Sequence, residues 1–172
     1  MWRNNSTGAL SKQPEKLLLH LKMDNRSQVL KHLEMIQGVI NRLGHDAFLI
    51  KGWSMAILAA GVIFIARSEV QSHAVVMAFF VPIIGFWILD GYFLSQERLF
   101  RELYDEIREQ DATDFAMNIM KHKGKPKCNW VVSIFSVTLN IFYGIEFLFL
   151  SVVFFALKYF GNILDATQQA VK

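Results

Sequence analysis

The sequence predicts an all-α integral membrane protein, with a transmembrane helical hairpin that continues into a cytosolic helical hairpin and with a C-terminal transmembrane helix. Hydrophobic residues make up 53% of its 172 residues and charged residues only 19%, which is too apolar for an ordinary soluble domain. The apolar residues gather in three runs that are long enough, or nearly long enough, to cross a bilayer. Helical spacing of apolar residues before the first run and after the second predicts the cytosolic part.

The chain before the first apolar run is predicted to have two parts. Residues 1–25 form an N-terminal tail with charges throughout, and they contain no apolar core long enough for a secretory signal. Residues 26–50 form a cytosolic amphipathic helix, because apolar residues recur there with the 4,3 spacing of a heptad repeat. We expect part of this stripe to be the interface between chains of a homo-oligomer; burial inside one chain is the alternative. The interface residues are Val29, Leu33, Ile36, Ile40 and Leu43.

The next two apolar runs predict a transmembrane hairpin. The first span covers residues 51–66 and the second covers residues 74–93, with residues 67–73 as the outer loop. Flanking apolar residues bring each span towards the roughly 20 residues that a bilayer requires. Lysine and arginine number eight in residues 1–51 and seven in residues 90–129, against one in the loop. The positive-inside rule therefore places both flanks of the hairpin in the cytoplasm, so most of the mass that lies outside the membrane is predicted to be cytoplasmic.

Two charged residues lie at matching positions in this hairpin. With position 70 as its centre, Lys51 lies 19 residues before it and Asp90 lies 20 after it. Antiparallel helices bring both residues to one depth, so we expect an interfacial charge pair that avoids an isolated charge in lipid. An unpaired carboxylate that faces headgroup water is the alternative. Trp53 and Trp87 are each 17 residues from the same centre, which predicts both indoles at the inner interface.

The second span is predicted to continue as a cytosolic helix over residues 94–111, with an apolar stripe at helical spacing. Residues 112–129 then form a short helix, with Asp111 or Thr113 as its N-cap, and a basic collar. Lysines beside a span on the inner side attract anionic lipid at about 1 kcal/mol each. The collar therefore predicts lipid binding, whereas RNA binding is the weaker alternative and DNA is not an expected partner. The lysines of the collar are Lys121, Lys123, Lys125 and Lys127.

Residues 130–157 are predicted to form the third span, and residues 158–172 the C-terminal tail. This run of 28 residues has Glu146 as its one charged side chain, and Asn140 lies on a face of small and mildly polar residues. Polar side chains in a span lie against a bundle interior or a water-filled path. We expect Asn140 and Glu146 to be intramembrane polar residues that line a pore. The alternatives are ordinary helix packing and, for Glu146, a position near an interface.

Residues that would support catalysis are not evident in the sequence. Nucleotide-binding glycine loops, zinc motifs and the GxSxG elbow are missing. A single cysteine, Cys128, excludes an intramolecular disulfide and a zinc site built from thiolates of one chain. Arginine followed by histidine, as in HEPN ribonucleases, occurs in "RSQVLKH" and "RSEVQSH", but roughly 0.6 such spacings arise by chance at this composition. We therefore expect no catalytic, cofactor-binding or metal-binding residue, and no enzyme.

Five segments together carry a resemblance to a known family. The order "HLEMIQGVINR", "FLIKGW", "FWILDGYFLSQERLFRELYD", "DFAMN" and "IFYG" resembles small bacterial membrane proteins with three apolar runs, over about residues 30–150. That group includes, or lies close to, the membrane accessory proteins of type VI-B CRISPR systems. The resemblance implies a divergent HEPN-like region, a homo-oligomeric pore-like ring in the bacterial inner (cell) membrane, and antiviral defence beside an RNA-guided RNA nuclease.

Two functions therefore compete. One is a pore-forming effector or accessory protein that permeabilises or depolarises the membrane as a homo-oligomer. The other is a non-conducting membrane scaffold or regulator that recruits a cytosolic partner through its helical hairpin. The lipid bilayer, anionic lipids and further copies of the chain are the expected partners of the first.

Overall fold

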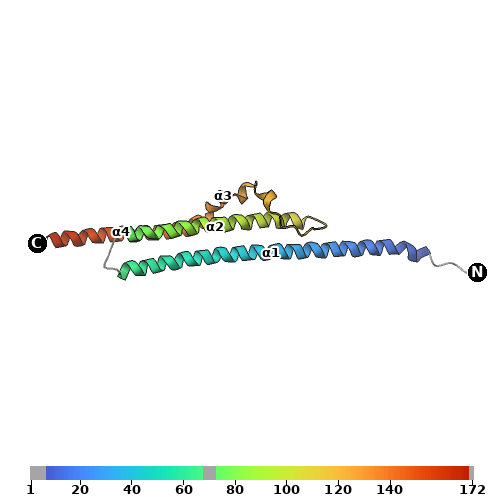
Figure 1. The fold of residues 1–172 in the computed structure, drawn as a ribbon, viewed down its shortest axis with the longest axis horizontal. Helices are drawn as coiled ribbons and strands as arrows, with labels where there is room; N and C mark the ends of the chain where they lie inside the picture. The colour runs from blue at the N-terminus through green and yellow to red at the C-terminus, as the bar shows by residue number, and fades with distance from the viewer. Residues whose placement is uncertain (1–6, 68–72, 171–172) are drawn as a thin grey trace, which may run out of the picture. The chain divides into compact units, whose positions relative to one another are not determined.

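The computed structural model describes residues 7–67 and 73–170, with side chains for residues 15–65 and 75–159. Within these ranges the chain is all-helical and has no strand (Figure 1). Three of the helices are long and apolar enough to cross a membrane. The predicted all-α class with three apolar helices is therefore confirmed. Residues 68–72 of the predicted outer loop lie outside the described part of the chain.

The helices differ from the predicted segments mainly at their ends. The first begins within the predicted N-terminal tail, and the last continues through most of the predicted C-terminal tail. The leucine-rich segment "EKLLLHLKM" explains the first extension, since leucine, lysine and glutamate are good helix formers. The elements are α1 (Thr7–Arg67), α2 (His73–Arg108), η1 (Met120–His122), η2 (Pro126–Cys128), α3 (Trp130–Ile134) and α4 (Val137–Ala170).

The prediction of a short helix after α2 is wrong. Residues 112–119 have no helical assignment, because short polar side chains bind the backbone in place of helical carbonyls. The backbone N–H of Phe115 donates to Thr113 Oγ1 at 3.2 Å, and that of Ala116 donates to Asp114 Oδ1 at 2.9 Å. Phe115 itself has a φ of 58°, a left-handed conformation that ends any helix. Thr113 therefore stabilises a turn and is not an N-cap.

The third apolar run is two helices, whereas we expected one span over residues 130–157. α3 ends after Ile134, and Phe135 has φ −88° and ψ 21°, outside the helical region. The Asn140 side-chain amide donates to the Phe135 carbonyl at 3.2 Å, which satisfies an acceptor that the break leaves open. The main apolar helix of this region is thus α4.

The chain divides into two compact units. The first comprises residues 1–41 and 99–123, and the second comprises residues 42–98 and 124–172. Helix α1 contributes to both, and so does α2. The second unit contains the apolar parts of α1, α2 and α4, and the first contains the amphipathic ends of α1 and α2.

The core of the first unit corrects the predicted oligomer interface. Four of the five residues assigned to that interface are 0–9% exposed and pack inside one chain against Leu103 and Ile107 of α2. A partner helix in the same chain is present at a much higher effective concentration than one in another chain. The apolar stripe of α1 therefore pairs with that of α2. The four are Val29, Leu33, Ile36 and Ile40; Leu43 belongs to the second unit and is half-buried.

The second unit has a core from all three apolar helices. Its buried members are Ile65, Val76, Ile83, Leu139, Tyr143 and Leu150. Gly91 of α2 allows α3 to approach closely, because a Cβ there would lie 2.4 Å from Ile134 Cγ1 and 2.9 Å from Ile134 Cα. Any larger residue at Gly91 would displace α3 from α2.

Candidate intramembrane polar site

A three-residue polar contact joins the apolar helices of the second unit. Lys51 Nζ of α1 lies 2.5 Å from Asp90 Oδ2 of α2, and the Tyr143 hydroxyl of α4 donates to the same oxygen at 3.2 Å. Asp90 is 1% exposed, so its charge depends on these two partners. The structure thus joins the two residues that the sequence placed at one depth. It adds Tyr143, which the sequence analysis did not identify.

A second polar contact joins α1 to α4. Ser54 Oγ donates a hydrogen bond of 2.6 Å to Glu146 Oε2, and both side chains are buried. Glu146 Oε1 has no hydrogen-bond partner among the described residues. The Glu146 carboxyl is therefore held by one donor and has one open oxygen.

The two contacts are successive steps along the same helices. Lys51 and Ser54 are three residues apart on α1, and Tyr143 and Glu146 are three apart on α4. Residues three apart lie on one helix face, about 4.5 Å along the axis. Glu146 therefore lies about one turn from the level of the Lys51–Asp90 pair. The position of Glu146 relative to a membrane interface stays a prediction.

Breaking either contact leaves a buried charge or acceptor. Removal of one partner of a buried ion pair costs about 3–5 kcal/mol, because the other partner stays desolvated. In hydrocarbon, an acceptor that loses its donor also has no water that could donate a hydrogen bond in its place. We conclude that these five side chains hold α1, α2 and α4 in register.

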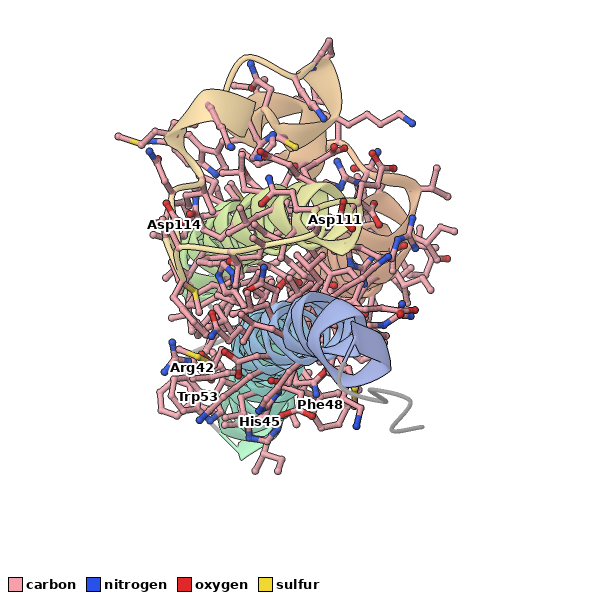
Figure 2. The ribbon with its side chains drawn as sticks, turned by 90° about the vertical axis from the view of Figure 1, so that its right-hand side faces the viewer. Arg42, His45, Phe48, Trp53, Asp111 and Asp114 are labelled. Atoms are coloured by element: carbon pink, nitrogen blue, oxygen red, sulfur yellow. The ribbon has the colours of Figure 1, made fainter. Side chains whose placement is uncertain are left out.

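Tryptophans attach α2 to the segment around α3. The Trp87 indole N–H donates to the Ile134 carbonyl at 3.0 Å, and the Trp130 indole N–H donates to the Ile88 carbonyl at 3.3 Å. Trp53 behaves differently, since its side chain is 60% exposed; in Figure 2 it projects from one flank of α1 and Phe48 projects from the other. Its exposed indole is suited to the inner interface of a membrane, where aromatic rings with a polar N–H concentrate.

The start of the third apolar region is held by side chains of α2. Ser95 Oγ donates to the Cys128 carbonyl at 2.7 Å. Arg98 Nη1 donates to the Lys127 carbonyl at 2.9 Å and to Ser133 Oγ at 3.2 Å. These contacts satisfy carbonyls of an irregular segment that would otherwise need water. Sequence reasoning missed Ser95 and Arg98, because no local pattern shows which backbone atoms a side chain reaches.

The four collar lysines do not share one environment. The Lys121 ammonium forms an ion pair with Glu106 of α2, and His122 Nε2 lies 3.0 Å from the other oxygen of that carboxyl. The hydrogen bond from Lys121 is the main cause that lowers the pKa of Glu106 below its ordinary value of 4.5. Lys123, Lys125 and Lys127 have exposed side chains. Their attraction to anionic lipid stays a prediction.

The histidine of "RSQVLKH" is part of the core of the first unit. His32 is 0% exposed, its Nδ1 lies 2.6 Å from Thr113 Oγ1, and its ring lies 5.5 Å from that of Phe115. A histidine in this position fastens the turn after α2 to α1. In "RSEVQSH", Arg67 and His73 lie outside the residues whose side chains are described.

Glu146 and Asn140, which we expected to line a pore, lie in different surroundings, and their role in a pore stays a prediction. Glu146 is bonded to Ser54, and Asn140 is exposed on α4 with its amide on the Phe135 carbonyl. Among residues 15–65 and 75–159, no group of three or more metal-ligating side chains lies together. Comparison with protein families, curated proteins and solved structures finds no match to this chain.

Proposed function

We propose that the protein is a homo-oligomeric membrane pore that permeabilises the bacterial cell membrane as an accessory of antiviral defence. The defence role and the link to an RNA-guided RNA nuclease rest on the sequence resemblance alone. Assembly rests on a surface of the first unit, and conduction rests on a polar side chain of the second unit.

The observation that carries assembly is an apolar stretch of α1 that no described part of the chain covers. Leucines and a methionine follow one another there with 53–69% of each side chain exposed. Burial of each such side chain is worth about 1.5–3 kcal/mol, and the five point to more than one side of α1, which suits a helix that contacts a neighbouring copy on either side. A second copy of the chain brings the same surface and can close a ring. The stretch comprises Leu17, Leu18, Leu19, Leu21 and Met23.

A face of α1 inside the second unit supports close contact between copies. Gly52, Ala56 and Ala60 are exposed and recur every four residues, and a Cβ on Gly52 would meet nothing within 4 Å. Small residues at this spacing let transmembrane helices approach closely. Exposed Asn140 would then be repeated once per subunit, which turns one amide into a polar annulus.

A non-conducting scaffold is the second candidate, and the Ser54–Glu146 hydrogen bond favours it. This bond uses Glu146 inside the chain and so removes one of the two polar side chains expected along a conducting path. In this case the exposed leucines of α1 would bind a cytosolic partner, and the membrane part would serve as an anchor.

Stoichiometry tests the proposal most directly. Mass photometry of the detergent-solubilised protein should show one closed homo-oligomer, and Leu18→Glu with Met23→Glu should give monomers that still insert into the membrane. Lys31→Glu is the matched control, because it adds the same residue at an exposed site of α1 outside the apolar stretch. A monomeric wild type, or a double variant with unchanged stoichiometry, would refute assembly through this surface.

A further inference from the structure

The described side chains of α1 and α4 form the walls of an open apolar groove that the proposed pore does not use. Its volume is about 600 Å³, a size typical of small-molecule sites. Eight of its nine lining residues are apolar, and Glu146 is the exception. They are Met55, Leu58, Ala59, Val62, Ile63, Phe142, Ile145, Glu146 and Phe149.

The groove is open at the surface of the apolar helices, which would face the lipid if these helices cross a bilayer. Its rim residues Met55, Ile63 and Ile145 are 56–62% exposed. From Met55 to Ile63 the groove follows α1 for about 12 Å, at 1.5 Å per residue. An extended hydrocarbon chain matches both this length and the apolar lining of the groove.

The polar end of the groove specifies the other part of the occupant. Glu146 is 4% exposed and lines the groove, and its Oε1 has no hydrogen-bond partner among the described residues. Lys51 and Asp90 pair with each other about one turn away, and neither is shown to contact Glu146. An ammonium N–H would satisfy the open oxygen with a charge-assisted hydrogen bond.

We propose that this groove binds a phospholipid whose head group carries a primary ammonium, with one acyl chain along α1 and α4 and the ammonium on Glu146 Oε1. The level of the site agrees with this orientation. Glu146 lies about one turn from Lys51, which with Trp53 was placed at the membrane interface, and the apolar walls extend from there into the bilayer. The lipid would complete the polar site and fill the groove between two helices.

Lipid retention tests the site. The full-length protein is purified in detergent from equimolar phosphatidylethanolamine and phosphatidylcholine with identical acyl chains, and bound lipid is measured by native mass spectrometry. Phosphatidylcholine carries a positive charge but no N–H donor. We expect one retained lipid per chain and a preference of about tenfold for phosphatidylethanolamine, as a charge-assisted hydrogen bond supplies.

Three variants separate the parts of the site. Ala59→Leu fills the groove and should abolish retention of both lipids, whereas Ala78→Leu places the same side chain at an exposed position of α2 outside the groove and should leave the retention of both lipids unchanged. Glu146→Gln should keep lipid bound but lose the preference. Equal retention of both lipids by the wild type, or full retention by Ala59→Leu, would overturn the proposal. A change in oligomer size in Ala59→Leu without loss of lipid would overturn it as well, since a second copy would then be the occupant.

Discussion

Lys51 Nζ of α1 lies 2.5 Å from Asp90 Oδ2 of α2, and Asp90 is almost completely buried while Lys51 remains partly exposed. The pair therefore places the charge of Asp90 among apolar helices with one cation and the Tyr143 hydroxyl as its partners. Asp90 is the first charged residue after the apolar part of α2. Because Lys51 pairs with it, the helix continues past this charge to Arg108.

A charge swap tests this pair. Lys51→Asp or Asp90→Lys alone should lower the membrane yield and should reduce the free energy of unfolding by about 3–5 kcal/mol, since each leaves a like-charge contact in a desolvated site. The double swap should recover part of the loss. Membrane-fraction yield and thermal aggregation in detergent measure the effect, with Arg42→Asp as an exposed control on α1. Equal loss in the single and double variants would argue against the pair.

The core of the first unit makes a different prediction from an interface between chains. Leu33→Asp and Ile40→Asp should each destabilise the unit by about 3–5 kcal/mol, because an unpaired polar group enters a packed apolar core. Limited proteolysis of the purified protein should then cut residues 15–41 and 99–123. Met35→Asp, at a position 47% exposed on the same helix, should stay protected. Folded monomers from the two core variants would restore the interface hypothesis.

The Glu106 carboxylate should make attachment of residues 111–123 depend on pH. Its pKa is lowered by the hydrogen bond from Lys121, so it stabilises the folded state above its ordinary value of 4.5 and this contribution is lost as the pH falls through the lowered pKa. Hydrogen exchange in this segment should rise below about pH 4.5, and Glu106→Gln should show raised exchange already at pH 7. Asp105→Asn is the control. It removes an exposed neighbouring carboxylate that pairs with Arg108, and its hydrogen exchange should follow the wild-type pH profile.

Conduction can be tested at Asn140 without disturbing the buried polar contacts. A voltage-sensitive dye should report depolarisation of cells under activating conditions, and Asn140→Leu should reduce it while mass photometry shows an unchanged oligomer. The cost to folding should be about 0.5–1.5 kcal/mol, the worth of the hydrogen bond to the Phe135 carbonyl. Ile141→Leu is the apolar control beside it. If the wild type forms a normal oligomer but does not depolarise the cells, the pore proposal is wrong and the scaffold candidate remains.

The sequence alone determined the class of protein and the level of its charges. Three apolar runs cannot be kept in water, so composition was enough to predict the helices long enough to cross a membrane. The contact between Lys51 and Asp90 followed from counting residues along two antiparallel helices, because each helix rises by a constant amount per residue. Helical periodicity likewise identified the stripe that includes Leu33 and Ile36.

Only the tertiary structure decided which surface covers each apolar or polar face. The periodicity shows that Leu33 must be buried. The same periodicity would occur if Leu33 were covered by Leu103 of its own chain or by a residue of another copy. The contact between Ser54 and Glu146 spans 92 residues of sequence, and it depends on the rotation of α1 and α4 about their axes. The turn at Thr113 depends on side-chain hydrogen bonds and on a buried His32 beneath it. These features result from packing between distant segments, which no local pattern of residues encodes.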